Sequence, residues 1–585
     1  SLNRVGYMNF DNRIGAVRSP SGSTKSDITH NQSRFAKMDA SASATKPRLP
    51  AELLILNRFG IGLPYLKAAW SISCRYGIPP FEILIAGGVI SEEIWLESQG
   101  LLAREKARAR RKSRTRILLL DSAINKLRDD RPEYSAEQTL TSGQAFAIFC
   151  GSFVLCYLFA TEFQLAILVS ILCLTVFYAS NILMRGLLLA DYDRDLAKVQ
   201  SLQPIEDHKL PVYTVLVALY NEPRQIRDLV EHLWNLNWPK HKLDIKLVCE
   251  ADDLETIAAI KTENLPQCFD LVMVPPVSPR TKPKALNYAL PLAHGKYLVL
   301  YDAEDQPSPD QLREAYNRFL VSDADVACLQ APLYIHNHRQ NWLCRMFAIE
   351  YLTLFNGILP VLAKWRVPFP LGGTSNHFRT DILRKVGAWD PYNVTEDADL
   401  GVRLFREGYR SETISLPTYE EAPPNLYPWL KQRTRWIKGW MQTILVHNRS
   451  PVAFFRDLGL RNGLAFHLFL TSIVISVIIH PIFLFLAIQQ IANLPIITPN
   501  GIDTLILGTS IFNLVGGYTT YGLLAYAVLK TSGHQSYSGF ILTIPFYWLL
   551  ISVAGWRAIF HLIVKPHMWE KTPHGLSNTK FGPKV

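Results

Sequence analysis

The sequence lacks the cysteine and histidine patterns of disulfide-bonded and zinc-binding proteins. Its eight cysteines in 585 residues include no CxxC pair, and no histidine-rich segment accompanies them. Three of them, Cys150, Cys156 and Cys173, fall in one apolar block. We therefore expect reduced thiols in a cytosolic or lipid setting, with neither a disulfide framework nor a zinc site.

The N-terminal region has few large apolar residues. Residues 1–47 are rich in Ser, Asn, Lys and Arg, a composition that predicts a disordered segment. They contain no apolar stretch of the length found in a secretory leader, so we expect no cleavable signal peptide.

The positive charge is not arranged as in a nucleic-acid-binding protein. Much of the formal net charge of +11 lies in the run Arg104–Arg116, which contains no aromatic residue. Single-stranded nucleic acids bind on aromatic stacking platforms, so we expect no nucleic-acid partner. A basic run before an apolar span binds anionic lipid headgroups and favours the cytoplasmic side, although a solvated helix end is the alternative. Residues 106–143 are thus predicted to be a basic linker.

Long apolar runs, by contrast, are abundant. The chain is 48% hydrophobic with a mean hydropathy of +0.07, and its apolar residues crowd at 144–184 and 464–564. Runs of this length predict membrane-spanning helices on both sides of a water-soluble middle. We expect a transmembrane hairpin at 144–184, with spans near 144–160 and 164–184, and a C-terminal transmembrane region at 464–564.

The number of full spans in the C-terminal region is left open. Spans are expected at about 464–489 and 503–529, with a third apolar stretch at about 538–564. The loop at 490–502 has no Lys or Arg and is expected outside, whereas the lysine-containing tail, 565–585, is expected in the cytosol. Five full spans do not satisfy both expectations if the middle of the chain is also cytosolic. Pro545 lies inside the last stretch, which makes a re-entrant or interfacial segment the alternative.

Two further regions complete the predicted organisation. Residues 48–105 have helical apolar periodicity broken by glycines and prolines, which predicts a small helical N-terminal module. This module provides structural support or binds a regulatory or export partner. In residues 211–448, strands are expected at Val212–Ala218, Ile245–Cys249, Leu271–Val274 and Tyr297–Tyr301, with helices near Arg224–Trp234, 283–293 and 308–320. Alternating strands and helices predict a doubly wound, mostly parallel sheet, with ligands at the carboxyl ends of its strands.

Two acidic clusters follow predicted strands. The first is Glu250-Ala251-Asp252-Asp253, where a carboxylate can accept hydrogen bonds from a nucleotide; a plain polar turn is the alternative. The second is Tyr301-Asp302-Ala303-Glu304-Asp305. Acidic groups two residues apart at a strand end can share a hard divalent cation, although ordinary turns also carry such clusters.

Two further clusters fall on predicted helices. Thr395-Glu396-Asp397 opens the helical run Ala398–Glu407, where Thr395 suits the N-cap and a first-turn carboxylate is stabilised by the helix dipole. Asp397 either caps this helix or, kept ionised there, acts as a general base. Gln432-Arg433-Thr434-Arg435-Trp436 lies on an amphipathic helix. One face suits the membrane interface, and the other can offer Arg and Gln to phosphate oxygens.

Residues 211–448 resemble the inverting, membrane-integral family 2 glycosyltransferases, the group containing cellulose, hyaluronan and curdlan synthases. The resemblance rests on the order of the four clusters: an acidic turn, a DxD-like cluster, TED and QxxRW. It implies a GT-A-like α/β domain inserted between transmembrane helices. It also implies a metal-dependent hexosyltransferase integral to the inner cell membrane, with its catalytic domain in the cytoplasm.

The resemblance also implies roles for individual residues. Asp397, with Glu396 beside it, is the catalytic base, and Asp302 with Glu304 or Asp305 holds Mg²⁺ or Mn²⁺. Trp436 lines the acceptor site, and the segment Leu371–Asn376 supports the acceptor end. The donor nucleotide and its diphosphate are expected to contact Glu250, Asp252, Asp253, Lys284, Asp302, Gln432, Arg433 and Arg435.

The implied reaction transfers a sugar from a UDP-sugar, with UDP-glucose expected ahead of UDP-N-acetylglucosamine, at the cytoplasmic face of the bilayer. The acceptor is expected to be a growing β-linked polysaccharide whose synthesis is coupled to export. The alternatives are a non-processive enzyme that glycosylates a membrane lipid and a catalytically silent membrane scaffold. This sequence departs from the family pattern at Glu250, where many relatives have Asp, and at Glu304, which leaves the second metal ligand open between Glu304 and Asp305.

Overall fold

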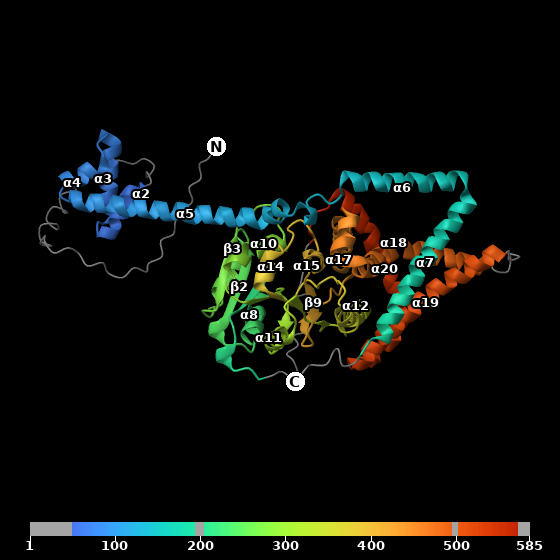
Figure 1. Cartoon of the computed structure of the whole chain (residues 1–585). Helices are drawn as coiled ribbons and strands as arrows, with labels where there is room; N and C mark the ends of the chain where they lie inside the picture. Colours follow the sequence, from blue (N-terminus) through green and yellow to red (C-terminus); the bar gives the residue numbers. More distant parts are fainter. Residues whose placement is uncertain (1–48, 194–203, 494–500, 571–585) are drawn as a thin grey trace. The chain divides into compact units, whose positions relative to one another are not determined.

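The computed structural model describes residues 49–193, 204–493 and 501–570. The predicted disordered segment, 1–47, and most of the predicted cytosolic tail lie outside the described residues. The chain divides into two compact units between Ile117 and Leu118. This boundary falls within one long helix, α5 (Glu92–Asp130), which also carries the basic run (Figure 1).

The first unit is helical, as predicted for the N-terminal module. Its apolar core is formed by Leu56, Leu66, Ala69 and Leu84, which are fully buried. The contributing elements before α5 are α2 (Ala51–Leu54), η1 (Ile55–Phe59), α3 (Leu63–Tyr76) and α4 (Pro80–Ala86). Gly77 ends α3 with a φ of 70°, a left-handed conformation in which a glycine carries no steric cost.

The second unit contains a seven-stranded sheet in the order β3-β2-β1-β4-β8-β6-β9. Strands β1 to β4 run parallel to one another, and only β8 runs antiparallel to its neighbours. The predicted mostly parallel sheet is thus confirmed, and all four predicted strands are present. The strands are β1 (Tyr213–Leu219), β2 (Leu243–Glu250), β3 (Phe269–Val274), β4 (Tyr297–Tyr301), β6 (Val326–Gln330), β8 (Asn376–Arg379) and β9 (Arg410–Thr413).

Helices cover both faces of this sheet. Adjacent residues of a strand point to opposite faces, so Val215 and Val217 of β1 pack on one side and Leu216 on the other. The first face packs against α8 (Ile226–Trp234), α9 (Leu254–Thr262) and α11 (Gln311–Val321). The second packs against α10 (Lys282–Ala289) and α14 (Thr380–Lys385). Burial on both faces explains why these strands are continuously apolar.

A smaller sheet and two helices border the carboxyl ends of the main strands. The small sheet has the order β5-β10-β7 and comprises β5 (Gln306–Pro307), β10 (Thr418–Glu420) and β7 (Leu333–Ile335). Helix α15 (Glu396–Arg406) begins at the TED cluster, and α16 (Leu426–His447) carries the QxxRW cluster.

The described part of the chain contains five helical stretches long and apolar enough to cross a membrane. Two form the predicted hairpin, α6 (Ser142–Thr161) and α7 (Phe163–Ala190). A third, Trp342–Lys364, was not predicted; 78% of its apolar window is buried within the protein, against 0% for α6. It comprises α12 (Trp342–Leu352), the π-helical turn η7 (Thr353–Ile358) and α13 (Leu359–Lys364), and it packs as part of the protein core.

The other two candidate spans lie near the C-terminus. Pro451–Phe485 joins α17 (Pro451–Phe466), η8 (His467–Thr471) and part of α18 (Ser472–Asn493). Gln535–Val564 joins η9 (Gln535–Thr543) to α20 (Ile544–Val564). Pro545 stands in the first turn of α20, where its missing amide hydrogen has no helical partner to lose, so it starts the helix rather than interrupting it.

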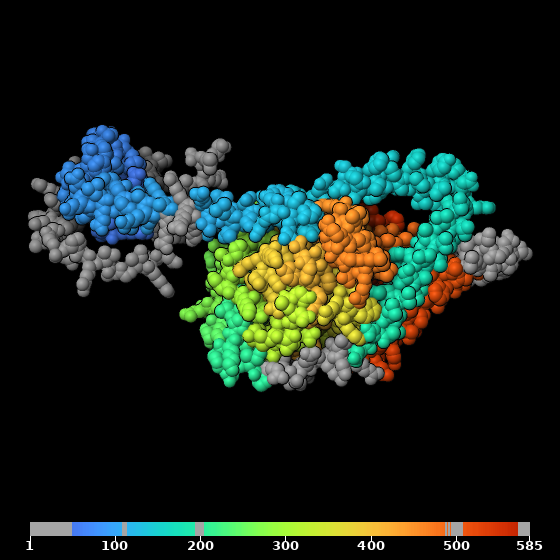
Figure 2. Space-filling model, in the orientation of Figure 1, coloured from blue at the N-terminus to red at the C-terminus, as the bar shows by residue number. Residues whose placement is uncertain are grey.

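The predicted span at 503–529 lies within α19 (Gly501–Thr531). Helix α19 is not one of the five candidate spans found among the described residues. Helix α19 packs along α7, and α20 packs along α16 and α18. The space-filling view shows an opening bordered by α6, α7 and the orange helices that follow α16 (Figure 2).

Candidate active site

A cavity of about 220 Å³ lies at the carboxyl ends of β1, β2 and β4, beside α15 and α16. It receives side chains from segments that are far apart in the sequence, as expected for the strand ends of a doubly wound sheet. The predicted site residues that line it are Glu250, Asp302, Glu304, Glu396, Asp397, Gln432, Arg433, Arg435 and Trp436.

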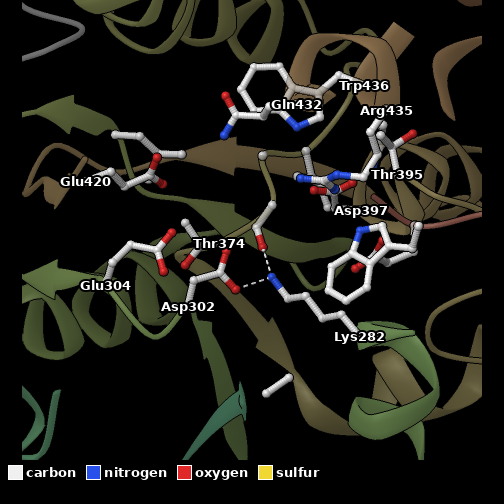
Figure 3. A pocket seen from close by; sticks show the side chains of 18 of the residues that line it. Lys282, Asp302, Glu304, Thr374, Thr395, Asp397, Glu420, Gln432, Arg435 and Trp436 are labelled. Atoms are coloured by element: carbon white, nitrogen blue, oxygen red, sulfur yellow. Dashed lines mark hydrogen bonds and ion pairs between the residues drawn. The ribbon is translucent and has the colours of Figure 1, made fainter. Parts of the chain in front are cut away.

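A lysine lies between the acidic groups of this cavity. Lys282, the first residue of α10, forms an ion pair with Asp302, and its Nζ donates a hydrogen bond to the Gly373 carbonyl at 2.7 Å (Figure 3). Burial alone lowers the pKa of Lys282, but the carboxylates of Asp302 and Glu396 outweigh burial and raise it. Lys282 is therefore a fixed cation facing the cavity.

The structure corrects the role expected for Lys284. Its side chain is fully buried outside the cavity lining, with Nζ 2.6 Å from Glu250 Oε1 and 2.8 Å from the Val277 carbonyl. Residues two apart on a helix point in different directions, so only one of the two lysines of α10 can face the cavity. Lys282 occupies the place expected for Lys284, while Lys284 holds Glu250 at the cavity rim.

Of the first acidic cluster, only Glu250 lines the cavity. Burial raises the pKa of Glu250, although Lys284 opposes this effect. Asp253 is buried and caps α9, accepting hydrogen bonds from the backbone N–H groups of Thr256 at 3.2 Å and Asn221 at 2.6 Å. Asp252 forms an exposed ion pair with Arg280 at 2.7 Å, and Arg280 reaches the lining. Asp252 and Asp253 therefore shape this edge of the cavity rather than line it.

The second cluster divides in the same way. Asp302 and Glu304 line the cavity, whereas Asp305 is fully buried and accepts hydrogen bonds from the Asp302 backbone N–H at 2.7 Å and from the Thr374 hydroxyl. Burial, together with the neighbouring Asp302 and Glu304, raises the pKa of Asp305. Glu304, not Asp305, is thus placed to ligate a cation beside Asp302.

The carboxylates of this cavity can supply only some of the ligands of a metal ion. No group of three or more His, Cys, Asp or Glu side chains among the described residues is arranged to hold a metal ion. Asp302 and Glu304 offer hard oxygen ligands on one side of the cavity, with Glu420 of β10 nearby (Figure 3). A divalent cation takes six or more oxygens, so diphosphate and water would complete its shell.

The TED cluster faces the same cavity from α15. Asp397 accepts a hydrogen bond from the Ala398 backbone N–H at 2.8 Å and lies beside Gly373, where an added Cβ would come within 3.0 Å of Asp397 Oδ2. Burial raises the pKa of Asp397, and Lys282 opposes this. Burial and the adjacent Asp397 raise the pKa of Glu396 to about 7. Thr395 occupies the N-cap position as predicted, but its side chain makes no capping hydrogen bond.

The two arginines of QxxRW point to different partners. Arg435 extends toward Asp397 and Thr395 (Figure 3), and its guanidinium also lies 5.6 Å from the ring of Trp569. Arg433 forms an ion pair with Glu350 of α12 at 2.6 Å and packs 4.6 Å from the ring of Trp436. The positive charge of Arg435 therefore faces the carboxylates of the TED cluster, whereas the carboxylate of Glu350 partly neutralises the charge of Arg433.

The charged and aromatic lining residues that were not predicted as site residues include Lys282, Glu350, Glu420 and Trp569. Trp569 reaches the cavity because the segment after α20 packs on α16, where Lys438 Nζ donates to the Met568 carbonyl at 2.7 Å. Arg557 and Glu570 fix the end of this segment through an ion pair at 2.7 Å. In the sequence, the feature that could have predicted this contact is Trp569 itself, a tryptophan among the polar residues of the tail.

A buried network holds α15 against α16. Asp399 accepts hydrogen bonds from Arg403 at 2.9 Å and His447 Nε2 at 3.1 Å, and all three side chains are fully buried. Gly439 of α16 packs directly on the Thr395 side chain, where a Cβ would overlap it. These contacts fix the TED cluster relative to QxxRW.

A second cavity, of about 210 Å³, lies among α7, α18, α19 and α20. It shares Glu350, Arg433, Trp436 and Trp440 with the lining of the first. Its lining is mostly apolar. The two cavities therefore meet at the QxxRW helix.

Comparisons with known proteins agree with this geometry. Residues 297–551 match the family model described as "Glycosyl transferase family group 2". Similar proteins include the probable glycosyltransferase YdaM of Bacillus subtilis, 27% identical over 40% of this chain and 57% of that protein. Cellulose synthase 1 catalytic subunit [UDP-forming] of Komagataeibacter xylinus is 24% identical over 42% of this chain and 33% of that protein.

Beta-monoglucosyldiacylglycerol synthase of Trichormus variabilis is 26% identical over 40% of this chain and 50% of that protein. The matched segments span between a third and 57% of the length of these relatives. Among solved structures, mannosyltransferase PcManGT from Pyrobaculum calidifontis in complex with GDP-Man and Mn²⁺ gives a TM-score of 0.43 at 19% identity, covering 68% of this chain and 98% of that one.

The family match begins at β4, which precedes the Asp302 cluster, continues through TED and QxxRW, and ends within α20. The sheet has the mostly parallel, helix-covered arrangement expected of a GT-A-like domain. The chain therefore carries a domain of glycosyltransferase family group 2.

Proposed function

We propose that the protein is an inverting glycosyltransferase that transfers a sugar from a UDP-sugar, UDP-glucose first, to an acceptor at the cytoplasmic membrane surface. The observation that carries this proposal is the convergence of Asp302, Asp397 and Arg435 on one cavity. Lys282 and Arg435 provide positive charge for a diphosphate, and Glu250 provides a hydrogen-bond acceptor for the nucleoside. A catalytically silent scaffold does not require these groups to meet.

The proposed reaction is a single displacement. The acceptor hydroxyl oxygen attacks the anomeric carbon, the bond from that carbon to the diphosphate oxygen breaks, and the hydroxyl proton passes to the Asp397 carboxylate. Burial keeps Asp397 more basic than an exposed aspartate. Lys282 and Arg435 stabilise the negative charge that develops on the leaving diphosphate.

Asp302 and Glu304 would hold Mg²⁺ or Mn²⁺. When bound there, the cation neutralises part of the diphosphate charge. The ion pair between Lys282 and Asp302 means that the lysine and the metal share one carboxylate.

We propose that the acceptor arrives from the membrane side, through the second cavity. Support comes from Trp436 and Trp440, which line both cavities at the membrane helices. The mostly apolar lining favours a lipid acceptor, whose chains need an apolar environment. The aromatic residues Tyr518, Tyr521 and Trp548 in the same lining favour the acceptor expected from the sequence, a growing β-linked polysaccharide whose sugar rings stack on them.

Product analysis tests this proposal. Purified protein in lipid nanodiscs would be given a panel of radiolabelled UDP-sugars, and the label would be separated into solvent-extractable lipid and insoluble polymer. Label in neither fraction, with no donor hydrolysis, would contradict the proposal. Label in the polymer fraction would select the polysaccharide alternative, and Asp397→Asn serves as the inactive control.

A further inference from the structure

Arg185 of α7 lies in the lining of the second cavity without an acidic partner. Its Nη1 donates one hydrogen bond, to the Gly517 carbonyl at 3.1 Å. The guanidinium also lies 5.6 Å from the Tyr521 ring and 5.4 Å from the Trp548 ring. In the described part of the chain no carboxylate forms an ion pair with Arg185, and the structure gives its five N–H donors the single hydrogen bond to Gly517.

A guanidinium in such a place is costly unless something pairs with it. A charge enclosed by protein is expensive unless it is paired, and Arg185 is enclosed by residues of α19 and α20. The two aromatic faces offset part of this cost. A phosphate oxyanion would complete the guanidinium's hydrogen bonds through its forked N–H groups.

The depth of Arg185 indicates where that phosphate comes from. Arg185 follows Phe163, the first residue of α7, by 22 positions, and at ~1.5 Å per residue this is ~33 Å along the helix. The hydrocarbon core of a bilayer is about 30 Å thick. If α7 crosses the bilayer along its length, Arg185 stands one hydrocarbon thickness from Phe163, on the side from which the chain leads into the sheet.

Two further polar side chains in the lining have unused hydrogen-bonding atoms. Asn513 of α19 is 2% exposed, and its Oδ1 has no hydrogen-bond partner. His480 of α18 is 7% exposed; its Nε2 lies 2.5 Å from the Tyr518 hydroxyl, but its Nδ1 has no partner. Buried polar groups are nearly always satisfied, so these atoms independently indicate a polar ligand in the cavity.

We propose that this cavity binds an anionic lipid and that Arg185 pairs with its headgroup phosphate. The lipid chains lie along the apolar lining, and the headgroup points toward Trp436, where the two cavities meet. Residues of α7 line the cavity, and the space-filling view shows an opening beside α6 and α7 (Figure 2). The lipid's role as sugar acceptor rests on the proposed function, whereas its binding does not.

Two lipids that differ only in the phosphate test the binding. The purified full-length chain, in a phosphate-free maltoside detergent, would be titrated with dioleoyl phosphatidic acid or with dioleoylglycerol, and bound lipid counted by native mass spectrometry. We expect phosphatidic acid to bind at least about tenfold more tightly, as one charge-assisted pair predicts. Millimolar inorganic phosphate should not displace it, because the lipid chains contribute to binding.

Variants assign the preference to the guanidinium. Arg185→Gln should reduce phosphatidic acid binding to the level of dioleoylglycerol, and Arg185→Lys should retain an intermediate preference. Arg461→Gln is the matched control, since Arg461 also donates to a backbone carbonyl, that of Trp365 at 2.9 Å, but lines neither cavity. This control should bind both lipids as the wild type does.

Three outcomes would overturn the proposal: equal binding of the two lipids by the wild type, unchanged binding by Arg185→Gln, or displacement by inorganic phosphate. If Arg185→Gln does not fold, the difference in binding of the two lipids to the wild type still tests whether the cavity prefers a phosphate headgroup. Because binding is measured without a sugar donor, its failure would leave the proposed transfer reaction intact. Conversely, an absence of sugar transfer would leave the lipid measurement valid.

Discussion

Lys282 and Asp302 form an ion pair across the cavity floor, joining the first residue of α10 to the end of β4. Two residues along the same helix, Lys284 pairs at 2.6 Å with Glu250, and this lysine is not part of the cavity lining. One helix thus supplies one lysine to the site and one to the packing beneath it. The two lysines should respond differently to the same substitution.

Lys282→Gln is expected to lower sugar transfer by ~10²-fold, about 2.7 kcal/mol, because it removes one cation from the developing diphosphate charge. The melting temperature should change little, since Lys282 lies at the cavity surface. Lys284→Gln should instead destabilise the fold by about 3–5 kcal/mol, because it leaves the buried Glu250 carboxylate unpaired. Equal losses of activity and stability in both variants would contradict this division.

Asp397→Asn should retain donor binding and lower transfer by about 10²–10⁴-fold, the usual contribution of a positioned general base. Donor binding is measured by calorimetry with UDP-sugar, and transfer is measured by radiolabel incorporation. The amide keeps the size of the side chain and its hydrogen bond from Ala398 N–H. Near-normal transfer by this variant would show that a group other than Asp397 accepts the proton of the acceptor hydroxyl.

Metal removal separates the two candidate second ligands. A chelator should abolish transfer, and Mn²⁺ or Mg²⁺ should restore it. Glu304→Gln should raise the metal concentration needed for half-maximal activity, because Glu304 faces the cavity. Asp305→Asn should leave that concentration unchanged and lower the melting temperature, because Asp305 supports the turn through the Asp302 backbone N–H at 2.7 Å. The reverse pattern would identify Asp305 as the ligand.

The sequence predicted the sheet well where strands are continuously apolar. The four predicted strands correspond to β1 to β4, which pair in parallel with one another. Strands β8 and β9 were not predicted because each has only four residues and is mostly or wholly polar. Helices α12 and α13 were also not predicted, although together they form an apolar stretch at Trp342–Lys364.

The site was predictable to the level of the cluster but not always of the residue. Each of the four clusters reaches the cavity, yet Asp252, Asp253, Asp305 and Lys284 do not line it. A cluster of adjacent acids cannot all point the same way, and the sequence does not indicate which one caps a helix or supports a turn. Contacts such as that of Trp569 depend on tertiary packing between α16 and the segment after α20, which local patterns do not encode.

Gly439→Ala should lower transfer by about tenfold or more, because the new methyl group overlaps Thr395 and moves α15 away from α16. Thr395→Ala in the same chain creates room for that methyl group. The double variant should therefore recover much of the activity lost in Gly439→Ala, with a coupling energy of about 0.5–3 kcal/mol. Additive losses would show that the two side chains do not act through one contact.

Asp390 gives the fold a pH dependence. Burial, followed by repulsion from Asp399, raises the pKa of Asp390 to about 7 from its ordinary value of 3.8. A folded-state pKa above the unfolded value means that the carboxyl group's contribution to stability is full below about pH 4 and is lost as the pH rises through about 7.

The wild type should therefore lose up to about 4 kcal/mol from this group between acidic and alkaline pH, at 1.36 kcal/mol per pKa unit. Asp390→Asn removes the ionisation, while its side-chain oxygen can still accept the hydrogen bond from the Tyr392 backbone N–H at 3.0 Å. Melting temperatures measured from pH 5 to pH 8.5 should consequently fall more steeply for the wild type than for Asp390→Asn. Parallel curves for the two proteins would show that Asp390 stays ionised in the folded state, held by its backbone hydrogen bonds rather than neutralised by burial.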